Sequence, residues 1–350
     1  MASIADVAAL AGVSPTSVSH ALSGRRKVSP EVLSKVLGAA ATLHYTPSRF
    51  AQSLADGKTK ILGLIVPDIN NIFFAQLAQV VERTAMASGY NILLSTTGFE
   101  HAREVHAFEM IRSRAVDGII YAAGAPPSTA ELVRLSAGMP MVLVDEELPG
   151  VMLPSFVSNN QSGGKLTAEY LATLGHERVL ILEAGSNLES SRLRVKGFES
   201  AWLSDPSKSV LRAMGGFTYE GAREAIRPLL DSIRESEITG IFATNDLMAL
   251  GAIDEMRDTG IRIPSQVSVV GFDDTLIGAL IRPGLTTVRQ DVVGMGEEAV
   301  KWLLNALDSG ATTTQPSLAT RRVLPVELVI RGTTGKRRDF NATSKLEKGI

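Results

Sequence analysis

The stretch "SIADVAALAGVSPTSVSHAL", residues 3–22, predicts two short helices joined by a tight turn. Ser3 can cap the first helix, and the apolar residues that follow recur at the spacing of one helix face. Gly12 ends this helix, because glycine is the residue that best adopts the conformation needed just past a helix end. Ser14 followed by Pro15 is typical of the start of the next helix.

A third helix is predicted directly behind these two, because Ser29 and Pro30 repeat the same start signal. Two helices joined by a short turn are typical of a helix–turn–helix, whose second helix enters the major groove of DNA. Residues 1–60 carry seven basic and three acidic residues, a net charge of +4, which leaves −6 for the rest of the chain. A basic head on an acidic body favours contact with a polyanion. From the pattern alone, a three-helix bundle that does not bind DNA is the alternative.

The residues expected to contact DNA lie on and just after the second helix. The first residues of a recognition helix reach base edges, nearby hydroxyl groups bind phosphates, and basic side chains supply the salt-dependent attraction. The expected base-edge contacts are therefore Pro15, Thr16, Ser17 and His20, and the expected phosphate contacts are Ser14, Ser19, Arg25, Arg26 and Lys27.

The composition is that of a folded protein with more than one domain. The chain has 350 residues, of which 45% are hydrophobic and 21% charged, and it contains no cysteine. The lack of cysteine excludes disulfides and thiolate-bound metals and fits a reducing compartment. The first residues do not resemble a signal peptide, and the apolar runs are too short to span a membrane. We therefore expect a cytoplasmic protein with no membrane partner.

From Ile61 onward, short apolar runs alternate with helical patterns in two successive series. "ILGLIVP", "NILLSTT", "GIIYA" and "MVLVD" belong to the first series, and "RVLILEA", "SVLRAMG", "GIFATND" and "VSVVGFDD" to the second. Buried strands separated by amphipathic helices predict two α/β lobes with parallel sheets. Such lobes bind ligands at the carboxyl ends of their strands, and those ends are polar here.

These motifs together resemble the lactose-repressor (LacI/GalR) family of bacterial transcription factors. "IADVAALAGVSPTSVSHAL", "YTPSRFAQSL", "TNDLMALGA", "VSVVGFDD" and "LTTVRQD" carry the resemblance, which extends over about residues 3–332. It implies a small all-α helix-turn-helix headpiece plus a two-lobed α/β periplasmic-binding-protein-like core with parallel sheets.

The resemblance also implies how the chain is divided. The expected parts are a headpiece at 1–46, a hinge helix and linker at 47–60, an effector-binding core at 61–333 and a disordered tail at 334–350. Within the core, the N-lobe would comprise 61–158 and 290–319, and the C-lobe 160–288 and 320–333. The hinge would place Leu54 in the minor groove at the operator centre, where an apolar wedge kinks the duplex.

Members of this family bind a pseudo-palindromic operator as dimers. The terminal "KLEKGI" lacks the leucine heptad of the lactose-type tetramers, so we expect a homodimer. The recognition helix looks closest to the purine-repressor subtype. His20 stands where many relatives have arginine, and Pro15 replaces a polar or aromatic residue, so the base preference at both positions is open.

The core resembles sugar-binding proteins whose two lobes close on a small ligand. Aromatic faces stack on the apolar face of a sugar ring, while amides and carboxylates bind its hydroxyl groups. The residues that match a ribose-type pocket are Asn71, Phe73, Phe74, Asp145, Arg194, Phe217, Asn245, Asp273 and Gln290. Two other uses remain open: Phe73 or Phe74 can belong to the lobe core, and the polar strand-end residues can cap helices.

Ribose or another pentose is the expected effector, with another sugar or polyol, or a purine, as alternatives. Glu146 departs from the ribose pattern, which has arginine at this position, and Asn159 stands where the purine pattern has an acid. Either direction of control, induction or co-repression, is compatible with the sequence.

Two other classes of protein compete with a regulator. No G-x-S-x-G, H-E-x-x-H or Walker motif occurs, and Asp273 is the one tempting candidate for a catalytic base in a sugar-metabolising enzyme. A periplasmic sugar-binding protein would need a signal peptide and would have no use for a basic headpiece. We therefore expect a ligand-responsive regulator, most simply a repressor of a sugar-utilisation operon, with no catalytic residue, cofactor or metal.

Overall fold

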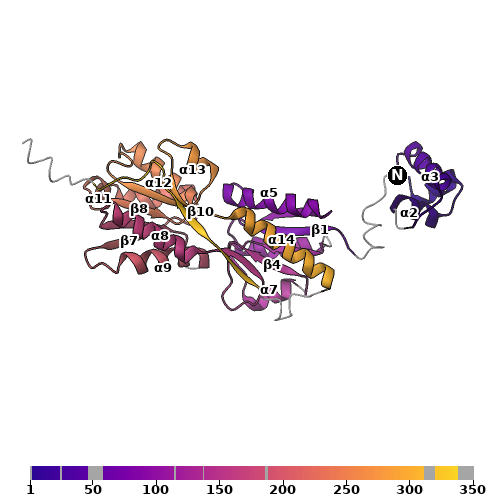
Figure 1. Cartoon of the computed structure of the whole chain (residues 1–350), viewed down its shortest axis with the longest axis horizontal. Helices are drawn as coiled ribbons and strands as arrows, with labels where there is room; N and C mark the ends of the chain where they lie inside the picture. The colour runs from indigo at the N-terminus through magenta and orange to yellow at the C-terminus, as the bar shows by residue number, and fades with distance from the viewer. Residues whose placement is uncertain are drawn as a thin grey trace, which may run out of the picture. The chain divides into compact units, whose positions relative to one another are not determined.

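The computed structural model describes residues 2–23, 26–45, 58–113, 116–136, 138–185, 188–310 and 320–337. The chain forms two compact units, Met1–Lys60 and Ile61–Ile350, drawn in Figure 1. Arg25, Leu54 and nearly all of the expected hinge at 47–60 lie outside the described residues.

The described residues of the first unit form three helices: α1 (Ile4–Ala11), α2 (Pro15–Ser23) and α3 (Pro30–Thr42). The Asp6 amide donates to the Ser3 hydroxyl (3.3 Å), while the Asp6 carboxylate accepts from the Ser3 amide (2.8 Å). The predicted cap of α1 is confirmed, as is its end at Gly12, whose φ is 66°. Valine and alanine side chains from all three helices form a small core of their own.

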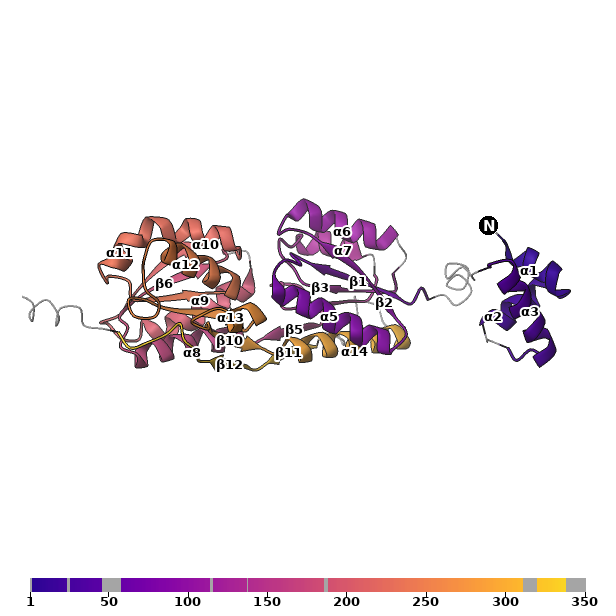
Figure 2. The same cartoon turned by 90° about the horizontal axis from the view of Figure 1, so that it is seen from above.

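The second unit consists of two lobes, each built on a six-stranded sheet (Figures 1 and 2). In the N-lobe, α6 and α7 cover one face of the sheet, and α5 and α14 cover the other. The N-lobe strands, in sheet order, are β11 (Arg321–Leu324), β5 (Ser155–Ser158), β4 (Met141–Val144), β3 (Gly118–Tyr121), β1 (Ile61–Val66) and β2 (Asn91–Thr96). Its helices are α5 (Ile72–Ala87), α6 (His101–Ser113), α7 (Thr129–Ser136) and α14 (Val292–Ser309).

The C-lobe has the same layered arrangement, with α8 and α9 on one face and α10 and α12 on the other. Its strands, in sheet order, are β12 (Val326–Val329), β10 (Thr286–Gln290), β9 (Ser268–Asp273), β8 (Gly240–Ala243), β6 (Arg178–Glu183) and β7 (Ser209–Met214). Its helices are α8 (Asn160–Thr173), α9 (Glu189–Trp202), α10 (Tyr219–Ile226), α11 (Leu230–Arg234), α12 (Asp246–Asp258) and α13 (Leu276–Leu280), with a 3-10 turn at Arg227–Leu229.

The chain passes between the lobes three times: after β5, after β10 and between β11 and β12. The expected boundary at residue 320 is wrong, because β11 pairs with β5 in the N-lobe sheet and the third passage lies at Pro325. Strand β12 enters the C-lobe from the N-lobe, so it runs away from the junction of the lobes. Strand β10 runs toward the junction and ends at it. For this reason β12 is antiparallel to β10, and the C-lobe sheet is mixed rather than wholly parallel.

Among the described residues, every helix is too short or too polar to cross a bilayer.

Candidate functional site

Several residues that follow strands have a backbone conformation that side chains seldom adopt. Phe99, Asp145, Phe217, Asp273 and Asp274 have positive φ values, of 58°, 65°, 59°, 126° and 58°. Each such residue costs about 1–3 kcal/mol and persists where the surrounding structure holds it, often at a binding site. Three of them, Asp145, Phe217 and Asp273, belong to the residues predicted for the effector pocket. Phe99 and Asp274 were not predicted.

Arg194 is a buried cation held in one place by the C-lobe. Its Nε donates to Oδ1 of Asn160 (2.8 Å), and its Nη1 donates to the carbonyl oxygen of Thr244 (2.6 Å). Its guanidinium carbon lies 3.9 Å from the centre of the Phe272 ring, and Nη1 lies 3.8 Å from Oδ1 of Asp273. Arg194 therefore presents a fixed positive charge beside a predicted site carboxylate.

The position of Arg194 depends on the close packing of α8 against α9. A Cβ atom on Gly164 would lie 1.9 Å from the carbonyl oxygen of Arg194, and one on Gly197 would lie 1.9 Å from that of Gln161. The two helices therefore touch through backbone atoms, which only glycine allows. This contact sets the distance from Arg194 to Asn160.

Three buried polar atoms have no hydrogen-bond partner within the described part of the chain: Oδ1 of Asp145, Oγ of Ser158 and Oε1 of Gln290. Gln290 uses its other terminal atom, Nε2, to donate to Oδ1 of Asp273 (2.7 Å). A buried polar atom left unpaired costs about 1–3 kcal/mol and is rare in native proteins. These atoms fit a ligand that supplies O–H or N–H donors.

Ser158 was not predicted as a site residue. It ends β5, where the chain first passes to the other lobe, and the polar run "SNN" after the buried strand was the available signal.

The carboxylates of the site are buried, which disfavours their charged form. Burial raises the pKa of Asp145 to about 6, against the opposing effect of Arg194. Burial and the charge of Asp145 raise the pKa of Glu146 to about 8. Burial also raises the pKa of Asp273 well above its ordinary value, although Arg194 and a hydrogen bond from Gln290 act in the other direction.

Glu146 links the two lobes. It follows β4 in the N-lobe, and its carboxylate accepts from the amide (2.8 Å) and the hydroxyl (2.6 Å) of Ser190, near the start of α9 in the C-lobe. The amino end of a helix favours a negative charge, so this carboxylate occupies a suitable place. Ser190 was not predicted, because its role depends on the approach of two separate lobes.

The predicted asparagines take part in local structure. Asn71 caps α5 by accepting from the Phe73 amide (3.1 Å), and Asn245 caps α12 by accepting from the Met248 amide (2.8 Å). Asn245 also donates to the carbonyl oxygen of Phe217 (3.3 Å). Both residues therefore have the capping use that the sequence leaves open for strand-end polar residues.

The predicted aromatic residues differ in their surroundings. Phe73 and Phe74 are both buried in the N-lobe core and pack edge to face, with ring centres 5.1 Å apart. Phe217 contacts Phe99, with ring centres 6.4 Å apart. Phe99 packs against the cores of both lobes, so the Phe99–Phe217 pair is an aromatic contact between them.

The predicted DNA-contact residues of α2 lie at its amino end. Ser14 accepts from the Ser17 amide (3.1 Å), and the two hydroxyl groups are 2.9 Å apart. The exposed members of the predicted set are Ser14, Pro15, Thr16, Ser19, Arg26 and Lys27, while Ser17 and His20 are half-buried. The first turn of α2 therefore offers hydroxyl groups and a proline ring at the surface of this unit.

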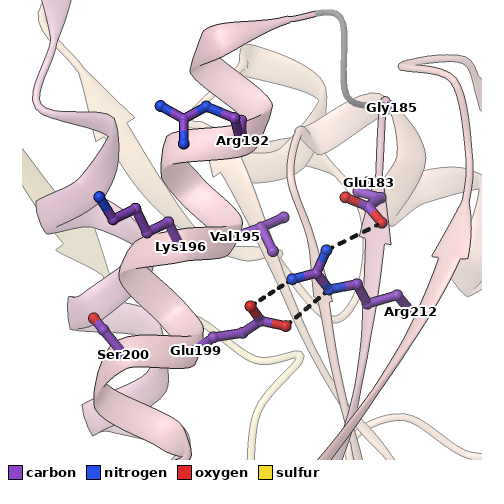
Figure 3. A pocket seen from close by; sticks show the side chains of 8 residues that line it. All are labelled: Glu183, Gly185, Arg192, Val195, Lys196, Glu199, Ser200 and Arg212. Carbon is purple, nitrogen blue, oxygen red and sulfur yellow. Dashed lines mark hydrogen bonds and ion pairs between the residues drawn. The ribbon is translucent and has the colours of Figure 1, made fainter.

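Two of the hollows on the described part of the second unit are compared with the predicted effector residues. The first, of about 500 Å³, lies between α9 and the edge of the C-lobe sheet, as Figure 3 shows. Arg212 in this hollow forms ion pairs with Glu199 and with Glu183, so its positive charge is already neutralised. The second hollow, of about 660 Å³, is lined in part by Asp273 and Gln290. Of these two hollows, the second is the one lined by residues predicted for the effector. In the described residues no three His, Cys, Asp or Glu side chains are placed to hold a metal ion.

Comparison with known proteins gives two matches to families. Residues 3–48 match the bacterial regulatory proteins of the lacI family, and residues 168–334 match the periplasmic binding protein-like domain. A ribose operon repressor of Haemophilus influenzae is 32% identical over 311 residues, which cover 88% of this chain and 92% of that protein.

Two solved structures of regulators of this kind are also similar to this chain. A lac repressor dimer bound to operator and the anti-inducer ONPF is 26% identical, with a TM-score of 0.80 and coverage of 95% of this chain and 99% of that one. A LacI-family regulator of Enterococcus faecalis V583 with bound ribose is 26% identical, with a TM-score of 0.69 and coverage of 79% and 100%. The chain belongs to the lacI family of bacterial regulatory proteins, which are DNA-binding transcriptional regulators and not enzymes.

Proposed function

We propose that this protein is a cytoplasmic repressor of a sugar-utilisation operon, bound as a homodimer to a pseudo-palindromic operator and controlled by ribose or another pentose. The observation that carries the effector proposal is the group of unpaired buried oxygens on Asp145, Ser158 and Gln290. A sugar supplies hydroxyl donors for these acceptors. The similarity to a ribose operon repressor and to a regulator with bound ribose supports the choice of a pentose.

In this proposal the sugar ring lies between the lobes. Asp145, Asp273 and Gln290 accept hydrogen bonds from hydroxyl groups, Arg194 donates to a ring or hydroxyl oxygen, and Phe217 covers the apolar face. The Glu146–Ser190 contact joins the same two lobes, so the ligand and this contact favour the same closed arrangement.

The effector acts on DNA binding by shifting a population. A ligand that binds one lobe arrangement more tightly raises its fraction, and only the difference in affinity matters. We propose that the first turn of α2 reads bases and that Leu54 wedges the minor groove. The lobe arrangement would then decide whether two headpieces fit two half-sites.

The effector is tested on the purified protein bound to a fluorescent operator obtained by selection from random duplexes. We expect D-ribose in the micromolar to millimolar range to change the anisotropy of this complex. If the protein binds the operator and neither D-ribose, D-xylose nor D-arabinose changes the anisotropy of the complex, a pentose effector is contradicted. The DNA-binding role would still stand.

Thr16→Ala and His20→Ala are each expected to weaken operator binding by about tenfold or more, because each removes a base contact in both half-sites. Ribose binding by calorimetry should not change. Ser34→Ala is the matched control, because it removes an exposed hydroxyl from α3 and not from the recognition helix. Equal losses in Thr16→Ala and Ser34→Ala would show that α2 is not the reading helix.

A further inference from the structure

We infer that Phe99 determines the size of the effector. Together with Phe217 it closes the effector pocket at the side opposite the passages between the lobes, so that the pocket admits one sugar ring and excludes a second. The inference rests on the proposed function, because it concerns the pocket proposed there. It depends on the place of Phe99 in the fold, on its contacts and on the backbone that holds it.

The three passages between the lobes lie at one edge of each sheet. They involve β11 and β5, at one end of the N-lobe sheet, and β12 and β10, at one end of the C-lobe sheet. The strands at the other end of the two sheets are β2 and β7, and we call this side of the second unit the open edge. At the open edge the pocket can be closed only by side chains that meet between the lobes.

Phe99 and Phe217 meet at the open edge. Phe99 is the third residue after β2, which ends at Thr96, and Phe217 is the third residue after β7, which ends at Met214. Their ring centres are 6.4 Å apart, and Phe99 is half-buried while Phe217 is buried. The two rings therefore form a contact between the lobes on the side away from the passages.

This ring pair adjoins the residues predicted to bind the effector. The guanidinium carbon of Arg194 lies 5.9 Å from the centre of the Phe217 ring, and its Nη1 lies 3.8 Å from Oδ1 of Asp273. Asp273 in turn accepts from Gln290, which ends β10 on the side of the passages. These contacts form a row from Gln290 to the ring pair, and Phe99 lies at its far end.

The distance between the two rings leaves no room for a sugar ring between them. Carbon atoms in contact lie about 3.5–4 Å apart, so a ring held between two others needs ring centres about 7–8 Å apart. The 6.4 Å between Phe99 and Phe217 is shorter and lies within the range of direct aromatic contact. A second sugar ring that extends from the pocket toward the open edge would have to displace Phe99.

The surroundings of Phe99 oppose such a displacement. A Cβ atom on Gly124 would lie 3.0 Å from Cδ1 of Phe99 and 2.9 Å from Cβ of Pro67, so the ring packs closely against the loop that follows β3. Glu104 holds this loop, because its buried carboxylate accepts from the amides of Gly124 and Ala125, each at 2.7 Å. The Phe99 ring is therefore backed by a wall that hydrogen bonds keep in place.

Phe217 is held in the same way in the C-lobe. Its carbonyl oxygen accepts from Nδ2 of Asn245 (3.3 Å), and the next residue, Thr218, caps α10 by accepting from the Gly221 amide (3.1 Å). Phe99 and Phe217 have nearly equal φ values, 58° and 59°, in the region that favours glycine. Each lobe thus keeps a strained backbone residue whose side chain contributes to this contact.

The test compares monosaccharides with disaccharides built from the same ring. The pairs are D-ribose with 5-O-β-D-ribofuranosyl-D-ribose, D-xylose with xylobiose, and D-glucose with cellobiose, each measured by calorimetry on the full-length protein. For the monosaccharide that binds most tightly, we expect wild type to bind the matching disaccharide at least tenfold more weakly.

Phe99→Gly removes the ring and suits the φ of 58°, so the loop can keep its path. We expect this variant to raise the ratio of the disaccharide to the monosaccharide association constant by about tenfold or more. The ratio is the readout because the loss of a contact between the lobes would, by itself, weaken both ligands alike. Phe99→Ala gives the same test if the glycine variant does not fold.

Two further variants serve as controls. Phe99→Tyr keeps the aromatic ring, so it should keep the wild-type ratio. Leu211→Ala removes an exposed apolar side chain from β7, the strand that precedes Phe217, and should also leave the ratio unchanged.

The failure of this inference differs from the failure of the proposed function. If wild type binds a pentose and Phe99→Gly has the wild-type ratio, the inference is overturned and the pentose effector stands. Equal binding of a monosaccharide and its disaccharide by wild type would also overturn it, because the second ring would then lie elsewhere, as in the hollow beside Gln290.

A wild-type protein that binds the operator but none of these sugars would contradict the pentose effector. In that case, disaccharide binding by Phe99→Gly would still support exclusion by the ring pair. The absence of disaccharide binding by this variant would overturn the inference together with the pentose effector.

Discussion

Replacing Gly164 by alanine is expected to lower the free energy of unfolding by about 3 kcal/mol or more, because the new methyl group meets backbone and not a movable side chain. The carbonyl oxygen of Arg194 would lie 1.9 Å away, so α8 and α9 must separate. The hydrogen bond from Arg194 to Asn160 spans these helices and would lengthen or break. Effector affinity should therefore fall together with stability.

Urea denaturation followed by tryptophan fluorescence, to which Trp202 and Trp302 both contribute, and by circular dichroism would measure this loss. Gly38→Ala is the control, because Gly38 lies on an exposed part of α3 with no atom within 4 Å of the added Cβ. That substitution should stabilise its own unit by about 0.5–1 kcal/mol, the ordinary gain when alanine replaces glycine inside a helix. A Gly164→Ala protein as stable as wild type would mean that the two helices are not held by backbone contact.

Replacing Glu146 by glutamine is expected to stabilise the ligand-free protein at pH 8 by about 4 kcal/mol and to have little effect below pH 4.5. The pKa of Glu146 is raised from 4.5 to about 8 in the folded state. Between these values the folded protein binds a proton that the unfolded chain does not bind. The contribution of Glu146 to the free energy of unfolding is therefore greatest below pH 4.5. It is lost as the pH rises from 4.5 through 8.

Glutamine does not titrate, so the variant should lack this loss. Urea denaturation at pH 5, 6.5 and 8 would give the free energy of unfolding of each protein as a function of pH. The curves of wild type and Glu146→Gln should separate as the pH rises, whereas that of Glu147→Gln should follow the wild type. Parallel curves for wild type and Glu146→Gln would mean that Glu146 has an ordinary pKa in the folded protein.

The start and end of helices could be predicted from sequence because the signals are local. A cap needs one side chain and an amide three residues away, as at Ser3 and Asp6. Strand order in parallel lobes is also constrained, since consecutive buried runs with helices between them allow few arrangements. The sheet to which each strand after residue 310 belongs could not be predicted. Pro325 divides one apolar run into two strands, and each strand joins the sheet of a different lobe.

The site could be predicted only as far as strand ends can be recognised. Asp145, Asp273 and Gln290 lie at the ends or edges of apolar runs, and the structure brings them near one another: Gln290 donates to Asp273, and Asp145 is close enough for its charge to act on Asp273. Ser190, Ser158 and Phe99 depend on how one lobe meets the other, and no local pattern carries that information. For Asn71 and Asn245 the sequence signal was visible but ambiguous. An asparagine at a strand end suits a helix cap and a sugar site equally well, and the structure uses both residues as caps.

The three passages between the lobes have a consequence for the order in which a ribosome makes the protein. The N-lobe needs α14 and β11, and the C-lobe needs β10 and β12, so neither lobe is complete until the last part of the chain has emerged. In the first unit, the three helices that the structure describes end at Thr42. During translation, the segment that would read DNA can therefore fold long before the segment that would control it is complete.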